Sequence, residues 1–203
     1  MAHVYIIGGA PRVGKTILAM RIIKKRPMFA ISADSIRDML RGVMNSSALS
    51  AIHDRTQNES AFATFLRIHP REGVKLQNDE SKIVWPSVNE LIMSYLADGQ
   101  DVLVEGVEIL PHLLAAATYD YRAVFLGNTS SEHSNTIAAQ AHARPHDWMH
   151  DYADDTVDAW ANLVRVYSRF IQQEAKNLGM PYVETHDHNF QQSLAEAEQI
   201  LLK

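Results

Sequence analysis

Short apolar runs alternate with longer amphipathic segments along this chain. The runs cover residues 4–7, 28–32, 101–105, 121–126 and 180–184. Their length and their content of β-branched residues are typical of strands that are buried on both faces of a parallel sheet. The pattern therefore predicts five strands, with a different kind of element between them.

The segments between the runs have helical periodicity. Helices are predicted over residues 16–25, 33–41, 81–97, 130–143, 154–178 and 190–202, with Gly42 and Gly179 as C-terminal stops and Pro86 near the start of its helix. Residues 43–76 read as polar, helical stretches without clear bounds. Strands that alternate with helices need crossover connections, so we expect an α/β fold with about five mainly parallel strands and helices on both faces.

Composition and charge narrow the possible classes of protein. The chain has 203 residues, of which 46% are hydrophobic, so one domain is sufficient. A net charge of −5 argues against a broad surface for nucleic acid or an anionic membrane. The absence of cysteine excludes disulfides and thiolate metal sites. No apolar run approaches the roughly 18 residues of a membrane helix, and the first run is too short for a signal peptide, so we expect a cytoplasmic protein.

The first strand runs directly into a phosphate-binding motif. Residues 9–16 read G-A-P-R-V-G-K-T, and they comprise Gly9, Ala10, Pro11, Arg12, Val13, Gly14, Lys15 and Thr16. The glycines let a row of backbone amides turn toward an anion, Lys15 is placed to reach the β- and γ-phosphates, and the Thr16 hydroxyl is placed to bind Mg²⁺. The helix that follows adds the positive end of its dipole. We call residues 9–16 the phosphate loop, and we expect it to bind ATP with Mg²⁺.

Two charged residues follow the second predicted strand. Asp34 and Arg37 stand in S-A-D-S-I-R, where ligands gather at the carboxyl ends of parallel strands. Spaced by three on a helix, they share a face, so Asp34 is placed to orient a hydroxyl and Arg37 to bind an acidic group. The alternative is that Asp34 only caps the helix and that Arg37 is solvated or paired with Asp38.

A carboxylate also ends the third predicted strand. Glu105 closes D-V-L-V-E, and Gly106 lets the backbone turn after it. At this edge of the sheet Glu105 is placed to orient the magnesium shell or the acceptor, and the alternative is a solvated strand end. Three histidines at 142, 146 and 150 are spaced by four, but Pro145 interrupts the helix that a metal-binding face would need.

These motifs resemble those of the phosphate-loop small-molecule kinases, a group that includes gluconate kinases, zeta-type toxins and 2-phosphoglycerate kinase. The third motif, V-L-V-E-G-V-E-I-L-P, looks most like 2-phosphoglycerate kinase. The resemblance implies a three-layer phosphate-loop fold with a mobile lid after the fourth strand, and it nominates Arg144 in A-H-A-R-P-H-D-W as the lid arginine. A cation there would neutralise charge on the transferring phosphoryl group.

The sequence thus predicts a single kinase-like domain, with residues 43–98 as a helical acceptor-binding insertion and residues 128–153 as the lid region. Its expected reaction moves the γ-phosphoryl group of ATP to a hydroxyl of a small, anionic acceptor, which Arg37, Arg55 and Arg71 would bind. One alternative is a zeta-type toxin kinase that acts on a nucleotide sugar. A second is an ATPase or nucleotide switch without an acceptor, and no feature of the sequence indicates the oligomeric state.

Overall fold

The fold is built on one sheet of five parallel strands. It is seen in a computed structural model that describes residues 2–45, 49 and 58–203. The strand order is β2-β3-β1-β4-β5, and every neighbouring pair is parallel. The strands are β1 (Val4–Gly9), β2 (Phe29–Ser32), β3 (Val102–Glu105), β4 (Tyr121–Gly127) and β5 (Tyr182–Glu184).

The strand register brings the carboxyl ends of the central strands to one edge of the sheet. Ile7 of β1 lies opposite Glu105 of β3, and Gly9 of β1 lies opposite Leu126 of β4. On the far side of β3, Ser32 of β2 also lies opposite Glu105. Polar residues at or just after the ends of β1, β2 and β3 therefore meet at this edge, and β2 and β3 lie on the same side of β1.

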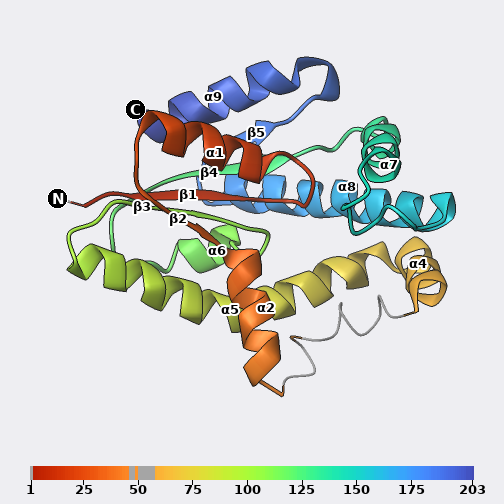
Figure 1. Ribbon diagram of the computed structural model, residues 1–203, viewed down its shortest axis with the longest axis horizontal. Coiled ribbons are helices and arrows are strands. Elements are labelled where there is room, and N and C mark those ends of the chain that lie inside the picture. The colour runs from red at the N-terminus through yellow and green to blue at the C-terminus, as the bar shows by residue number, and fades with distance from the viewer. Residues whose placement is uncertain (1, 46–48, 50–57) are drawn as a thin grey trace.

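Helices cover both faces of the sheet (Figure 1). They are α1 (Lys15–Lys25), α2 (Ala33–Val43), α4 (Glu59–Ile68), α5 (Pro70–Ala97), α6 (Pro111–Leu114), α7 (His133–Ala143), α8 (Asp154–Asn177) and α9 (Phe190–Leu202), with a 3₁₀ turn η1 (Asp187–Asn189) before α9. Helices α1 and α9 pack together on one face, while α5 and α8 pack on the other, and α4 and α7 lie against α8. The result is a three-layer α/β architecture.

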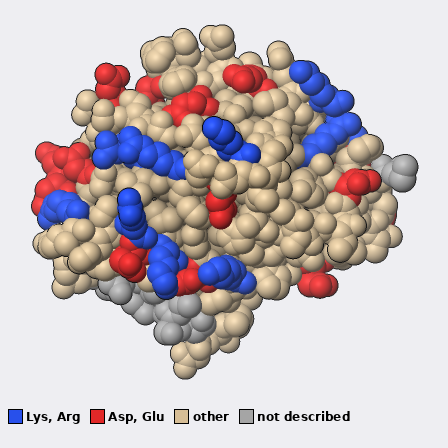
Figure 2. Space-filling view, turned by 180° about the vertical axis from the view of Figure 1, so that it is seen from behind, with Lys and Arg blue, Asp and Glu red and all other residues tan. Residues whose placement is uncertain are grey.

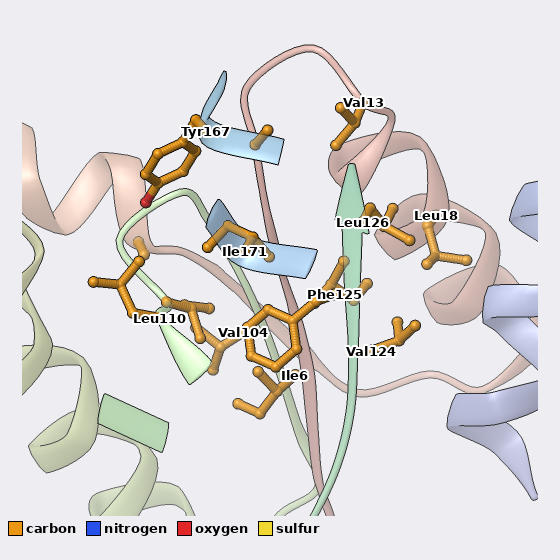
Figure 3. Close-up of a cluster of buried hydrophobic side chains, with 14 of the residues drawn as sticks. Ile6, Val13, Leu18, Val104, Leu110, Val124, Phe125, Leu126, Tyr167 and Ile171 are labelled. Carbon is orange, nitrogen blue, oxygen red and sulfur yellow. The ribbon is translucent and has the colours of Figure 1, made fainter. Parts of the chain in front are cut away.

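The core follows the alternation of side chains along the buried strands. Figure 3 shows the Phe125 ring on the same side of the sheet as Ile171 of α8, whereas its neighbour Leu126 is directed to the other side, toward Leu18 of α1. All four side chains have 0% of their surface exposed. Burial of both faces explains why the strands read as unbroken apolar runs in the sequence.

One hydrogen bond links this core to the loop after β3. The buried Tyr167 hydroxyl on α8 donates to the carbonyl oxygen of Val107 at 3.1 Å. Because Val107 lies between Glu105 and Glu108, the bond holds the backbone that carries both carboxyl groups.

The predicted α/β sheet is confirmed, and several helix bounds differ from those predicted. Helix α5 begins at Pro70 and not near residue 81, so Pro86 lies in its interior and not near its start. A proline at the first helical position loses no hydrogen bond. The cost of Pro86 is offset by burial of its neighbours Val84 and Trp85, since tertiary packing overrides local preference.

Smaller differences occur elsewhere. Helix α2 continues through Gly42 to Val43, α7 begins at His133 and not at residue 130, and the short helix α6 was not predicted. The described part of the predicted insertion, residues 58–98, is helical as α4 and α5. The predicted lid region, residues 128–153, consists of α7 and the irregular segments on either side of it.

The described helices and the surface agree with the charge and hydropathy of the sequence. Within residues 2–45, 49 and 58–203, no helix combines the length and the apolar character needed to cross a bilayer. On the face shown in Figure 2, acidic side chains lie among the basic ones, so this face has no uniformly basic surface.

Candidate active site

The phosphate loop has a backbone that only glycine accommodates at two positions. Gly9 has a φ of 133°, and a Cβ there would lie 2.1 Å from the carbonyl oxygen of Leu126. Gly14 has a φ of 96°, and a Cβ there would lie 2.6 Å from the Phe190 ring. These glycines let the loop lie against β4 and α9 while it turns into α1.

The turn leaves backbone donors without acceptors. In the described part of the chain, no carbonyl or side chain accepts a hydrogen bond from the amides of residues 12–17, and no side chain caps α1. Unpaired amides at a helix N-terminus bind anions, because the donors and the helix dipole act together. The loop therefore fits the phosphates of a nucleotide.

Lys15 lies buried inside this loop. Its Nζ donates to the carbonyl oxygen of Ala10 at 2.7 Å. Burial lowers the pKa of Lys15, while the charges of Asp34, Glu105 and Glu108 oppose that shift. The ammonium group is thus the cation that faces three carboxyl groups, and a bound phosphate would give it a further anionic partner.

The side chains of Thr16 and Glu105 bring two oxygen atoms together at the end of the phosphate loop. The Thr16 hydroxyl donates to Oε1 of Glu105 at 3.2 Å. Glu105 is only 7% exposed, and burial raises its pKa, with the charge of Lys15 acting in the opposite direction. A hydroxyl and a carboxylate suit Mg²⁺, which prefers hard oxygen ligands and would favour the ionised form of Glu105.

Asp34 lies in the first turn of α2 with its side chain 44% exposed. Burial of part of the group raises its pKa, but a hydrogen bond with Glu108 and the charges of Lys15 and Arg37 outweigh that effect, so the pKa of Asp34 is lowered. The carboxylate is accordingly ionised at neutral pH. It is suited to accept a hydrogen bond from a hydroxyl.

Glu108 is the fully buried partner of this carboxylate. Its side chain is 0% exposed, and its Oε1 accepts from Nη1 of Arg37 at 2.9 Å. Burial and the neighbouring charge of Asp34 raise the pKa of Glu108 well above its usual value. The pKa values of the two neighbouring carboxyl groups are thus shifted in opposite directions, so Asp34 gives up its proton more readily than Glu108 does.

One cavity of about 670 Å³ joins these groups. Its lining comes from the phosphate loop, from the ends of β2 and β3, from α7 and the turn after it, and from the start of α9. The lining residues are Pro11, Arg12, Gly14, Lys15, Thr16, Ile17, Asp34, Glu105, Val107, His133, Thr136, Gln140, Arg144, Trp148, Asp187, Phe190 and Gln191. The phosphate loop, both predicted carboxylates and the predicted lid arginine thus face a single volume.

The lid region contacts the phosphate loop through Arg12. Its Nη1 donates to Oδ2 of Asp147 at 3.0 Å, and its guanidinium lies 5.4 Å from the ring centre of Trp148. Burial raises the pKa of Asp147, yet the hydrogen bond from Arg12 keeps it below its usual value. Arg144, at the end of α7, is exposed and makes no ion pair within the described residues. Arg12 is thus paired with a residue of the predicted lid region, whereas Arg144 is available to a ligand.

The three arginines predicted for the acceptor have different positions. Arg37 does not line the cavity, because its guanidinium pairs with Glu108 and Asp38. Arg71 is exposed in the first turn of α5 and is also absent from the lining. Arg55 lies outside the described residues.

The sequence did not predict four polar residues that lie in or near this site, namely Glu80, Glu108, His133 and Asp187. Glu108 had a visible signal, since it follows Glu105 by three residues in the same loop. Glu80, His133 and Asp187 had none, because they stand in helices and turns far from any motif. The histidines at 142 and 150 bond to a carboxylate and to backbone carbonyls, and the described residues contain no cluster of side chains suited to a metal.

Glu80 supplies a test of these buried charges. It is 2% exposed, and its Oε2 has no hydrogen-bond partner among the described residues. Burial raises its pKa from 4.5 to about 7, against the charges of Arg37 and Arg41. The folded protein therefore holds this proton more tightly than the unfolded chain, and stability falls as the pH rises from 4.5 through 7.

We expect Glu80→Gln to remove this loss of folding stability at high pH. At pH 8 the variant should be more stable than the parent chain by about 2 kcal/mol, and the difference should shrink below pH 5. Urea unfolding at both pH values measures the effect. Glu90→Gln is the matched control, because Glu90 is an exposed carboxylate on the same helix. Equal stability of Glu80→Gln and the parent chain at pH 8 would contradict the assigned pKa shift.

Comparison with known proteins places the fold in one class. No protein-family model matches the sequence. Among solved structures, a shikimate kinase from Acinetobacter baumannii in complex with shikimate has a TM-score of 0.52 at 12% identity, covering 100% of this chain and 97% of that one. A gluconokinase from Sinorhizobium meliloti has a TM-score of 0.50 at 13% identity, covering 98% and 93%. The chain has the fold of the phosphate-loop small-molecule kinases.

The curated relatives have a more specific name. A 2-phosphoglycerate kinase from Methanocaldococcus jannaschii is 25% identical over 193 residues, which cover 89% of this chain and 58% of the relative. A 2-phosphoglycerate kinase from Methanopyrus kandleri is 23% identical over 207 residues, which cover 98% of this chain and 62% of the relative. The chain thus spans about three fifths of the length of these relatives.

Proposed function

We propose that this protein is an ATP-dependent phosphotransferase that phosphorylates a hydroxyl of a small, anionic metabolite resembling 2-phosphoglycerate. The observation that carries the proposal is the shared cavity, in which unpaired phosphate-loop amides and Lys15 face the same volume as Asp34 and Glu105. A phosphate site alone would suit any nucleotide-binding protein. An ionised carboxylate beside it supplies what a transfer to a hydroxyl requires.

The roles of the residues follow from their positions. The amides of residues 12–17 and Lys15 hold the phosphates, and Thr16 with Glu105 holds Mg²⁺. When bound, ATP supplies the γ-phosphoryl group and Mg²⁺ supplies positive charge at its oxygens. Asp34 orients the acceptor hydroxyl and accepts its proton as the new P–O bond forms and the bond to the β-phosphate oxygen breaks.

Two further roles concern charge and water. Arg144 neutralises charge on the phosphoryl oxygens from the lid side. The contact between Arg12 and Asp147 holds residues 128–153 against the phosphate loop, and closure of this region over the bound substrates would limit transfer to water. Binding of the acceptor's acidic group by Arg37 would require its exchange with Asp38 or Glu108, and Arg55 and Arg71 remain proposed partners of the same group.

Acceptor-dependent ADP release tests the proposal. The purified chain is given Mg-ATP with 2-phosphoglycerate, 3-phosphoglycerate, glycerate, gluconate, shikimate or UDP-N-acetylglucosamine, and ADP is measured by a coupled assay. We expect 2-phosphoglycerate or a close analogue to raise the rate by about tenfold or more over ATP alone. Stimulation by the nucleotide sugar alone would favour the zeta-type alternative. ADP release that no acceptor changes would favour the ATPase alternative and contradict the transferase.

A further inference from the structure

The cavity has two chemically different sides, divided by the phosphate loop. In the strand order β2-β3-β1-β4-β5, the phosphate loop follows the central strand. On the β2 and β3 side the lining contains the carboxyl groups of Asp34 and Glu105. On the β4 and β5 side it contains His133 of α7 and Phe190 of α9. A nucleotide held by its phosphates in the middle would therefore have its nucleoside on one side and its acceptor on the other.

The β4 and β5 side suits the nucleoside. The Phe190 ring lies close to Gly14, so an aromatic surface directly adjoins the phosphate loop. Purine bases stack on such rings. The opposite side carries the ionised Asp34, which suits the hydroxyl acceptor. This assignment rests on the proposed function, since it takes a nucleoside triphosphate to be the ligand.

His133 is the buried polar residue on the nucleoside side. Its side chain is 8% exposed, and its Nδ1 lies 2.8 Å from Oδ1 of Asp187. Its Nε2 is buried and has no hydrogen-bond partner among the described residues. An unpaired nitrogen in a buried side chain is costly, and this one belongs to a residue that lines the cavity.

Asp187 determines which ring nitrogen of His133 carries the proton. Its Oδ2 accepts from the Thr136 hydroxyl at 3.0 Å, and its Oδ1 lies 3.4 Å from the donor Nδ2 of Asn128. A carboxylate surrounded by donors in this way is itself an acceptor, so a neutral His133 ring would donate to it from Nδ1. The unpartnered Nε2 then carries a lone pair, and it belongs to a side chain that lines the cavity.

A second side chain adds a donor. Oε1 of Gln191 accepts a hydrogen bond from Arg21, which leaves the amide NH₂ of Gln191 as the group offered to a ligand. Gln191 lines the same cavity as His133. The nucleoside side thus provides an acceptor from His133 and a donor from Gln191.

We propose that His133, oriented by Asp187, selects the nucleobase by accepting a hydrogen bond from an exocyclic amino group, so that the site favours adenine over bases with an oxo group at the same position. An oxo group would place its lone pair against the lone pair of Nε2. A site that hydrogen-bonds an N–H group discriminates strongly against an analogue that lacks it, because its own polar atom is then left unpaired. His133 is a specificity-determining residue in this scheme and takes no part in phosphoryl transfer.

Equilibrium binding of three nucleotides tests the inference. ATP and inosine triphosphate differ at one edge of the purine ring, where adenine has an amino group beside an unprotonated N1 and hypoxanthine has an oxo group beside a protonated N1, and 2′-deoxy-ATP tests the ribose separately. Calorimetry on the wild-type chain with Mg²⁺ should give an affinity for ATP that is about tenfold or more above that for inosine triphosphate. His133→Phe should reduce this ratio to about threefold or less, mainly by weakening ATP binding.

Controls separate this inference from the proposed function. Inorganic tripolyphosphate should bind the wild type and His133→Phe equally, because it reports on the phosphate loop alone. His142→Phe changes another histidine of α7 that does not line the cavity, and it should keep the wild-type ratio. His133→Ala, which removes the same nitrogen with less bulk, should lose discrimination in the same way and serves if the phenylalanine variant does not fold.

The outcomes are distinct. An ATP preference that is unchanged in both His133 variants would overturn the inference and leave the transferase proposal standing. A second outcome would also overturn the inference: the wild type binds 2′-deoxy-ATP more weakly than ATP, it does not discriminate against inosine triphosphate, and His133→Phe binds ATP and 2′-deoxy-ATP equally. This outcome would assign His133 to the ribose. If neither ATP nor tripolyphosphate binds the folded wild type, the phosphate site itself is refuted.

Discussion

Replacing Lys15 by alanine should abolish acceptor-dependent ADP release while leaving the fold intact. The side chain supplies a buried positive charge that interacts with Asp34 and Glu105, and its Nζ lies within the phosphate loop. Without it, the phosphoryl charge that develops during transfer has no fixed lysine partner, and the carboxyl groups lose their compensating cation. Removal of one pre-organised charge of this kind typically lowers turnover by about a hundredfold to a thousandfold.

The experiment compares kcat/KM for Lys15→Ala with that of a matched variant, Lys24→Ala. Lys24 is an exposed lysine near the end of the same helix, so its removal should leave the rate unchanged. Far-ultraviolet circular dichroism and thermal unfolding verify that both variants fold. A folded Lys15→Ala protein with a rate close to that of the wild type would show that phosphate transfer does not use this loop.

Replacing Asp34 by asparagine should separate turnover from nucleotide binding. Asp34 lines the cavity but stands on α2, outside the phosphate loop, so the variant should bind ATP with nearly wild-type affinity. An amide cannot take the proton of the acceptor hydroxyl, and we expect kcat to fall by about tenfold to a hundredfold or more. The dissociation constant of Mg-ATP and the steady-state rate are the two measurements needed.

Asp38→Asn is the control for this experiment. Asp38 stands one turn further along α2 and pairs with Arg37 and Arg41, away from the cavity. It should retain the wild-type rate. An Asp34→Asn variant with wild-type kcat would reduce Asp34 to the helix-capping role, whereas a large loss of ATP affinity would place it in the nucleotide site.

The lowered pKa of Asp34 bears on how it acts. Because Asp34 hydrogen-bonds with Glu108 and interacts with the charges of Lys15 and Arg37, its pKa is lowered and it is ionised at neutral pH. A carboxylate of low basicity is a weak proton acceptor in the ground state and a good orienting group for a hydroxyl. The phosphoryl-transfer transition state is loose, so orientation and charge are the larger needs at this position.

The sequence alone was sufficient for the sheet and for the phosphate loop. Apolar runs report burial on both faces directly, and the glycines of the loop correspond to backbone torsions that other residues rarely adopt. The positions of Asp34 and Glu105 could also be predicted, because Glu105 ends β3, Asp34 lies two residues after β2, and parallel strands end at one edge. The bounds of α5 could not be predicted from the sequence. Pro86 locally favours a helix start, but the packing of α5 outweighs this preference.

Only the tertiary structure decided which charges meet. Arg12 pairs with Asp147 across 135 positions, Arg37 with Glu108 across 71, and His133 with Asp187 across 54. Local sequence determines torsions and periodicity, which act over a few residues and define the strands, the loop and the residues at strand ends. Pairing, burial and the resulting pKa shifts depend on side chains that the fold brings together from distant segments, so they follow from packing and not from any motif.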